Sequence, residues 1–262
     1  MVTVDLAERE LAEELVARRG EPDTPFGLYA VWSEDPAADL GRAVERDVFF
    51  EAFGNTPDLL AQEYDVYEPA SLFLIAVDHN RLLPAGVLRL ITATPIGLKT
   101  LHDIERVWGE SLDDVLERSG VTFHPERVWD GATMAVRREY RASATDGIIS
   151  ASFLQSVPQL GHVFPIDYVL ATVDVVVLKL IQDMCARPMH AFKGVEPIRY
   201  LDSPLSVPAY FDIAEYTERV RPDPSLYEMW IEGKGFEAAI STPDWAELAR
   251  VTRPQVPQAA DH

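Results

Sequence analysis

The spacing of hydrophobic and polar residues divides the chain into helices and strands. Apolar residues recur at helical spacing over 4–19 and 39–53, with charged residues on the opposite face. Two apolar runs, 71–77 and 85–91, flank a short polar turn and predict a hairpin. Further strands are predicted over 28–32, 132–136, 166–173, 198–200 and 207–213, and further helices over 98–118, after 147, and over 175–186, 226–230 and 245–250.

This order of elements predicts the α/β (α+β) class, with a mixed, mostly antiparallel central sheet flanked by helices on both faces. A doubly wound nucleotide-binding fold is disfavoured because no Gly-x-Gly-x-x-Gly follows a first strand and no P-loop occurs. The predicted organisation is a helical extension over 1–26, a core domain over 27–216, a helical extension over 217–250 and a disordered tail over 251–262.

Charge and composition exclude several classes of function. The formal net charge of -20 over 262 residues argues against nucleic acid, whose phosphates require a basic surface. No apolar run approaches the ~20 residues of a membrane span, and the acidic amphipathic N-terminus differs from a signal peptide. Cys185 is the single cysteine, which fits a reducing, cytoplasmic location, and the histidines lack metal-ligand spacing.

Residues 128–150 carry the strongest chemical signal in the chain. They predict a short strand, a turn of basic and small residues, and a helix start, an arrangement that suits a phosphate or a developing oxyanion. Within the turn, Arg137, Arg138 and Arg141 either dock a phosphate of a thioester donor or form a solvated turn. The donor-binding candidates are the backbone of Met134, Ala135 and Val136, if a bulge splays the strand there, with Arg138, Arg141, Ser143, Ala144, Thr145 and Gly147.

This passage resembles the acyl-donor site of the GNAT superfamily of N-acyltransferases, where M-A-V-x-x-x-Y-R, here 134–141, begins that site. Within the superfamily the chain is similar to LuxI-type acyl-homoserine-lactone synthases and long-chain N-acyl amino acid synthases over about 46–213. The resemblance rests on R-x-x-x-F at Arg46 and Phe50, on Asp65 and Glu68 where the family carries D-x-Y-D, and on G-x-x-R-L with Arg89. Thr133 departs from the family pattern, because it stands at the position of the family's strand arginine.

The resemblance implies that six residues bind the acceptor, namely Arg46, Phe50, Asp65, Glu68, Arg89 and Thr133. A buried Arg89 also requires a partner on physical grounds, because an unpaired buried charge is costly. Arg46, Asp65 and Arg89 could therefore form a structural ion-pair network that braces the N-terminal helix. The two roles are compatible, and the sequence leaves both open.

Acyl transfer to an amine requires a base, a polarised thioester carbonyl and a proton for the departing thiolate. Asp130, at the mouth of the predicted strand, is the candidate base. Cys185 either protonates the thiolate or is a buried small hydrophobe. The co-substrate is acyl-CoA or a carrier-bound acyl-phosphopantetheine, because Asp146 stands where many coenzyme A-dependent acetyltransferases have a small residue. No permanently bound cofactor and no metal are expected.

The leading hypothesis is an N-acyltransferase that acts on a small, amino-acid-like amine by direct attack, since no activated nucleophile is evident. The second is a non-catalytic acyl-thioester sensor, and the third is a short-chain acetyltransferase with a narrow pocket. The sequence leaves open the acyl length, the identity of the acceptor, an acyl carrier protein partner and the oligomeric state.

Overall fold

The computed structural model describes residues 6–20, 23–94, 96–141, 145 and 147–250, which build a mixed sheet of nine strands. The strands are β1 (Phe26–Trp32), β2 (Ser71–Asp78), β3 (Leu83–Ile91), β4 (Val128–Val136), β5 (Tyr168–Asp174), β6 (Met189–Ala191), β7 (Ile198–Tyr200), β8 (Ser203–Asp212) and β9 (Ile240–Ser241). The α-helices are α1 (Leu6–Ala17), α2 (Ala38–Phe53), α3 (Pro57–Tyr64), α4 (Lys99–Arg106), α5 (Leu112–Ser119), α7 (Ile148–Val163), α8 (Val175–Met184), α9 (Ile213–Val220), α10 (Pro224–Trp230) and α11 (Trp245–Arg250), and η1 (Asp65–Ala70), η2 (Pro125–Arg127) and η3 (Arg138–Tyr140) are 3₁₀ turns.

Apart from the parallel β1–β9 pair at one edge, the sheet consists of two antiparallel parts that meet at one short parallel contact. Its strand order is β6-β8-β5-β4-β3-β2-β1-β9, with β7 also paired to β8. β4 and β5 pair in parallel only through 128–130 and 168–170. Beyond that point β4 continues along β3, and β5 continues along β8. The two strands therefore part after Asp130 and Leu170, and this divergence positions the site described below.

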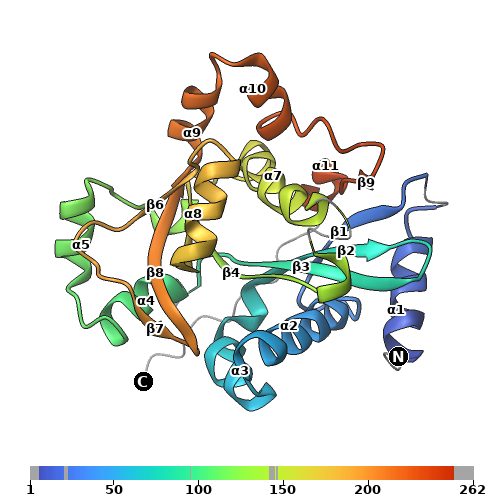
Figure 1. Cartoon of the computed structure of the whole chain (residues 1–262), viewed down its shortest axis with the longest axis horizontal. Coiled ribbons are helices and arrows are strands. Elements are labelled where there is room, and N and C mark those ends of the chain that lie inside the picture. The colour runs from blue at the N-terminus through green and yellow to red at the C-terminus, as the bar shows by residue number, and fades with distance from the viewer. Residues whose placement is uncertain (1–5, 21–22, 95, 142–144, 146, 251–262) are drawn as a thin grey trace.

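Alternating side chains on the strands bury both faces of the sheet. On β2, Phe73, Ile75 and Val77 belong to the apolar cluster that includes α1 and α2. Leu72 and Leu74 belong to the opposite cluster, which includes α7 and α9 to α11. Figure 1 shows α2 below the strands, α7 above them, and α4 and α5 beyond β8. A strand buried on both faces needs a continuous apolar run, which is the pattern of 71–77.

The structure confirms the predicted fold class, with a mostly antiparallel sheet between helices. β4 is longer than predicted, because it begins at Val128 rather than at Ala132. α3 and α9 were not predicted, although Thr56 and Asp212 cap their first turns. α1 packs with α2 and the sheet, and β9 pairs with β1 at the sheet edge. The tail over 251–262 lies outside the described residues. Among the helices that the structure describes, none is long and apolar enough to cross a membrane.

Candidate active site

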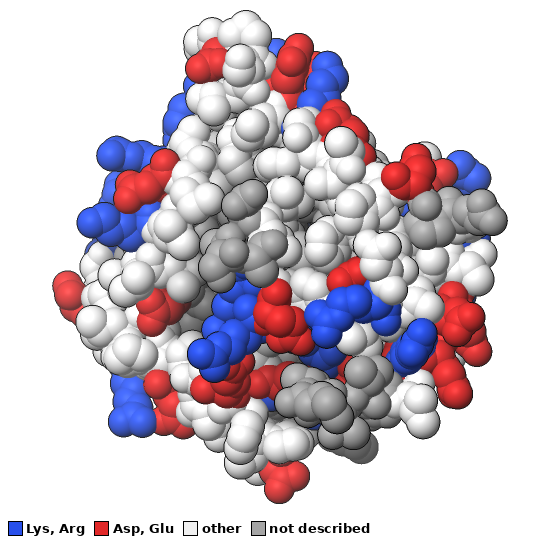
Figure 2. Space-filling view, turned by 45° about the vertical axis from the view of Figure 1, so that its right-hand side comes forward, with Lys and Arg blue, Asp and Glu red and all other residues white. Residues whose placement is uncertain are grey.

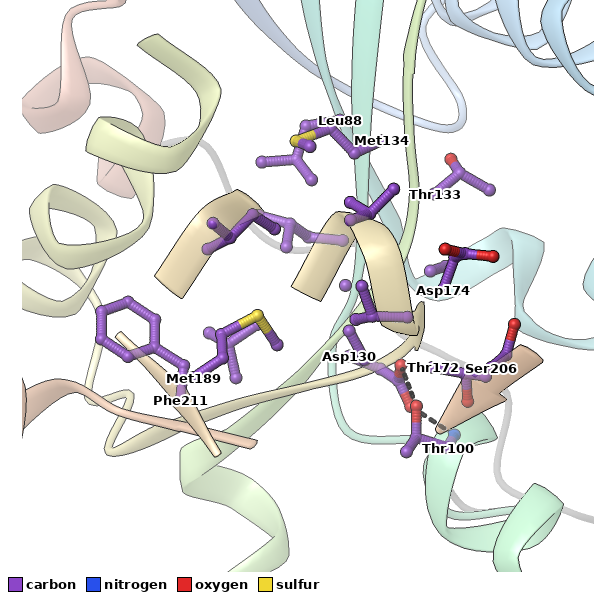
Figure 3. Close-up of a pocket in the computed structure, with 18 of the residues that line it drawn as sticks. Leu88, Thr100, Asp130, Thr133, Met134, Thr172, Asp174, Met189, Ser206 and Phe211 are labelled. Carbon is purple, nitrogen blue, oxygen red and sulfur yellow. Dashed lines mark hydrogen bonds between the residues drawn. The ribbon is translucent and has the colours of Figure 1, made fainter. Parts of the chain in front are cut away.

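A cavity of about 230 Å³ occupies the gap where β4 and β5 part. Residues 131–134 of β4 and 171–174 of β5 both line it. One side of the cavity is polar and the other apolar: in Figure 3, Asp130, Thr172 and Ser206 lie on one side, and Met189 and Phe211 on the other. α8 and the C-terminal part of the chain close the apolar side through Ile181, Cys185, Tyr216 and Trp230. The shape suits a ligand with one polar, reacting end and one hydrocarbon end.

Asp130 lies in the wall of this cavity and is only 1% exposed. Its carboxylate accepts two hydrogen bonds from Thr100 at the start of α4, at 2.6 Å from the backbone nitrogen and 2.8 Å from the hydroxyl (Figure 3). Burial raises the pKa of Asp130 to about 6, against the opposing effect of the two Thr100 hydrogen bonds and of nearby Lys99. The group is therefore mainly ionised at neutral pH and still able to take up a proton.

A buried ionic cluster, the Lys99 cluster, stands beside Asp130 and comprises Lys99, Asp103, Glu63, Arg106 and Tyr200. The Lys99 ammonium donates to Glu63 at 2.9 Å, to Asp103 at 2.7 Å and to the Tyr200 hydroxyl. Arg106 pairs with the same two carboxylates, at 3.0 Å and 2.9 Å. Lys99, Asp103 and Tyr200 line the cavity. Burial raises the pKa of Tyr200, so its phenol keeps its proton.

A second cluster, the Arg89 cluster, comprises Arg89, Glu45, Glu68 and Arg42. Arg89 is 2% exposed and pairs with Glu68 and, at 3.5 Å, with Glu45. Arg42 also pairs with Glu68, at 2.8 Å from its Nε. Arg89 donates a further bond of 2.9 Å to Ser71. The buried arginine thus has the partner that physical reasoning required, and α2, η1 and β3 are tied together.

The partners of Arg89 differ from those predicted for the structural network. Arg46 and Asp65 are exposed and take no part in the ion pairs that the structure describes around Arg89. Phe50 is 63% exposed. Arg42 lies one helical turn before Arg46, and the turn containing Arg42 and Glu45 is the one that packs against the sheet. The Arg46–Asp65 part of the predicted network is therefore wrong, whereas the acceptor-binding role of these residues stays a prediction.

Thr133 connects the Arg89 cluster to the cavity. Its hydroxyl donates to Glu45, and Thr133 itself lines the cavity. Burial raises the pKa of Glu45, against the opposing effects of Arg89 and Thr133. Arg89, Glu45 and Glu68 are absent from the described cavity lining. The predicted acceptor residues therefore divide into one wall residue, Thr133, two residues behind the wall, Arg89 and Glu68, and three exposed residues, Arg46, Phe50 and Asp65.

The bulge in β4 falls at a different position from the one expected. The β3–β4 register shifts between Arg89 and Leu90, so that Ala132 is the extra residue. Met134, Ala135 and Val136 pair regularly with β3, and of these three only Met134 lines the cavity. The bulge on which an oxyanion role of their N–H groups depends is therefore absent at 134–136, and that role stays a prediction.

The basic turn after β4 is largely neutralised by carboxylates. Arg137 pairs with Glu8 at 2.9 Å and with Asp47 at 2.6 Å. Arg138 and Arg141 pair with Glu51, at 3.4 Å and 3.6 Å. Acidic and basic side chains lie interleaved on the face seen in Figure 2, around a hollow of uncharged residues. Thr145 donates to the Tyr140 carbonyl at 2.9 Å and Gly147 caps α7, while Ser143 and Ala144 lie outside the described residues.

Cys185 lies on the apolar side of the cavity and is 1% exposed. Burial raises the pKa of its thiol to about 12. Its carbonyl accepts a 2.9 Å hydrogen bond from the Tyr216 hydroxyl. The side chain therefore packs as a small hydrophobe, and the thiol keeps its proton at neutral pH. The described residues contain no group of His, Cys, Asp or Glu arranged to hold a metal ion.

Sequence reasoning missed most of the polar cavity wall. Lys99, Thr100 and Asp103 lie on α4, whose charged sequence is typical of a solvent-facing helix. The available signal was the i,i+4 spacing of Lys99 and Asp103 directly after an apolar segment. Tyr200 gave no local signal, because its partners are about a hundred residues away in the sequence, with a separation of 101 for Lys99.

Two solved structures of N-acyltransferases share this fold. The CoA-dependent acyl-homoserine lactone synthase BjaI, solved with SAM and isopentyl-CoA, has a TM-score of 0.51 and 16% identity over 87% of this chain and 100% of that one. FeeM, an N-acyl amino acid synthase from uncultured soil microbes, has a TM-score of 0.52 and 12% identity over 74% of this chain and 94% of that one. No protein-family model and no curated protein matches the sequence. The chain therefore has the fold of GNAT-type N-acyltransferases, and the predicted structural resemblance is confirmed.

Proposed function

We propose that this protein is an N-acyltransferase that moves an acyl group from acyl-CoA or an acyl-carrier protein to the amine of a small, amino-acid-like acceptor. The observation that carries the proposal is Asp130, a buried carboxylate with a pKa raised to about 6 in the wall of a largely apolar cavity. The shared fold of N-acyltransferases supports the same chemistry.

The proposed reaction is direct attack without a covalent enzyme intermediate. Asp130 takes a proton from the acceptor ammonium, and the neutral amine then attacks the thioester carbonyl carbon. The C–N bond forms, the C–S bond breaks, and the thiolate leaves with one of the two remaining nitrogen protons. An ammonium ion and a thioester thereby yield an amide, a thiol and one proton, which Asp130 releases to solvent.

Two cavity residues could relay this nitrogen proton to the leaving thiolate, each giving its own proton to sulfur and taking up the one from nitrogen. Cys185 is protonated at neutral pH but lies among apolar side chains. Tyr200 is also protonated and lies in the polar wall, where its hydroxyl oxygen accepts a hydrogen bond from the Lys99 ammonium. Loss of activity in Cys185→Ala, or in Tyr200→Phe with unchanged acyl-CoA binding, would assign the proton donor.

The apolar side of the cavity supports an acyl chain longer than acetyl. Met189, Phe211 and Trp230 line a single space with the polar wall. Burying each methylene of a chain there contributes about 0.8 kcal/mol. A narrow pocket for acetyl groups alone would need no lining of this extent.

The test is thiol release, followed with a thiol-reactive dye, for C2 to C16 acyl-CoAs with a pooled amine library and for the matching acyl-carrier proteins. Amine-dependent release with a chain-length optimum, lost in Asp130→Asn, is expected. Activity with acetyl-CoA alone would indicate the acetyltransferase alternative. Tight acyl-thioester binding without release from any donor would contradict the proposal and indicate a binding module.

A further inference from the structure

The cavity wall carries negative charge that its own cation does not balance. The charged side chains in the described lining are Lys99, Asp103, Asp130 and Asp174. Lys99 and Asp103 pair with each other at 2.7 Å. Asp130 and Asp174 form no ion pair among the residues that the structure describes. Two carboxylates in the wall are therefore left without a counter-ion.

Both of these carboxylates have only neutral hydrogen-bond donors. Asp130 accepts from Thr100, as described above. Asp174 caps α8 by accepting from the Val176 backbone at 2.8 Å, and it accepts from the Ser203 hydroxyl at 2.7 Å. These bonds satisfy the oxygens in part but leave each negative charge in place. A ligand that brings a positive charge would supply the missing partner.

Lys99, the cation in the described cavity wall, has no donor left for a ligand. An ammonium group carries three N–H donors. Those of Lys99 go to Glu63, Asp103 and Tyr200. Thr133 lines the cavity with a neutral side chain, and its hydroxyl donates to Glu45. An acceptor carboxylate in this cavity would meet no free cation among the described residues and would lie near two like charges.

One neutral group, the buried Thr172 hydroxyl, also lacks a hydrogen-bond partner among the described residues. Thr172 lines the cavity, and its hydroxyl oxygen is buried without a hydrogen-bond partner in the described part of the chain. It can accept an N–H from an ammonium group. A buried polar atom without a partner is costly, so a ligand that pairs with it is stabilised.

Given the proposed function, we infer that the acceptor is a cationic amine that carries no free carboxylate, such as an amine, or an amino acid whose carboxyl group is an ester, amide or lactone. The ammonium group neutralises the charge of the wall and lies within reach of the base. A carboxylate would be buried unpaired, which proteins avoid. The net charge of -20 acts in the same direction, because it concentrates cations rather than anions near the protein.

The test compares acceptors that differ only in the carboxylate. The pairs are phenylalanine with 2-phenylethylamine, lysine with cadaverine, and each amino acid with its amide, measured as kcat/KM for thiol release at a fixed acyl-CoA concentration. The carboxylate-free member should be preferred about tenfold or more. The decarboxylated amines are at least as basic as the amino acids, so their preference cannot arise from a larger neutral fraction.

Asp174→Asn removes one of the unbalanced charges. Asparagine is also a good helix cap, so the Val176 bond is kept. The preference against carboxylates should fall several-fold in this variant. Asp183→Asn on the same helix is the matched control, because Asp183 is exposed and is absent from the described lining of this cavity. It should leave the preference unchanged.

The outcomes separate this inference from the proposed function. Equal use or preference of the free amino acids would overturn the acceptor class and leave acyl transfer intact. An equal shift in Asp174→Asn and Asp183→Asn would overturn the assignment to the cavity wall. Absence of amine-dependent release with every acceptor would overturn the proposed function, and the acceptor class with it.

Discussion

The Arg89 cluster and the Lys99 cluster have almost the same composition but different surroundings. Each joins a buried cation and a more exposed arginine to two carboxylates. The ring of Tyr64 lies between them, with its centroid 5.0 Å from the Arg89 guanidinium carbon and 5.3 Å from the Lys99 nitrogen. Only the Lys99 cluster contributes to the described cavity lining.

The position of each cluster relative to the cavity separates a structural role from a role in the reaction. The Arg89 cluster lies behind the wall and joins α2, η1 and β3. Removing it should therefore mainly lower the free energy of unfolding. The Lys99 cluster stands in the wall beside Asp130, so changes there should alter the reaction as well. Buried ion pairs of similar composition can be structural or functional, and their position relative to the cavity indicates which role each has.

The largest expected effect is on the wall side, at Asp130. Asp130→Asn should lower kcat by about 10²–10⁴, the contribution typical of a general base. In the wild type the rate should rise with pH through about 6 and then level off, because the base must be ionised. A pH–rate profile of both proteins checks this. An unchanged acidic limb in the variant would show that another group is the base.

The same substitution should stabilise the fold. The pKa of Asp130 rises from 3.8 unfolded to about 6 folded, so the folded state holds the proton more tightly. The free energy of unfolding of the wild type therefore falls as the pH rises from about 4 to about 6, and this loss persists above pH 6. Asparagine can accept from the Thr100 backbone N–H and donate to the Thr100 hydroxyl, and should recover up to about 3 kcal/mol above pH 6. Urea unfolding at pH 4 and pH 8 measures the change.

The next largest effect is expected on the free energy of unfolding, when the buried cation of each cluster is replaced in turn. Arg89→Met leaves Glu45 without an arginine partner and should lower the free energy of unfolding by about 3–5 kcal/mol. Lys99→Met should cost less, because Arg106 still pairs with Glu63 and Asp103. Denaturant unfolding of both variants tests this order. A larger loss in Lys99→Met would mean that Arg106, with an exposed side chain, contributes little.

The smallest effect is expected at the basic turn. Arg138→Ala and Arg141→Ala should change the free energy of unfolding by less than about 0.5 kcal/mol, because their ion pairs with Glu51 are exposed. If these arginines bind the donor phosphates, KM for acyl-CoA should rise several-fold while kcat stays the same. Glu51→Gln, which frees both arginines, should then lower KM. An unchanged KM in all three variants would identify a solvated turn.

Much of the fold could be predicted from the sequence, because its signals are local. The apolar run 71–77 and its neighbour 85–91 specify a hairpin within twenty-one residues, and the buried strands follow from continuous apolar stretches. The site was predicted less completely. Asp130 and Thr133 are in the wall, but Arg46 and Arg42 lie one turn apart on the same helix face. Periodicity alone could not decide which of the two arginines the sheet would cover.

The sequence by itself determined most of the secondary structure, the burial of the central strands and the position of Asp130 in a strand, since each depends on neighbours a few residues apart. The tertiary structure decided which charges are buried and what they pair with. Lys99 meets Glu63 and Tyr200, which are 36 and 101 residues away in the sequence. Such pairings exist only once the strands have parted and the helices have packed, because burial creates the need for a partner that no local pattern records.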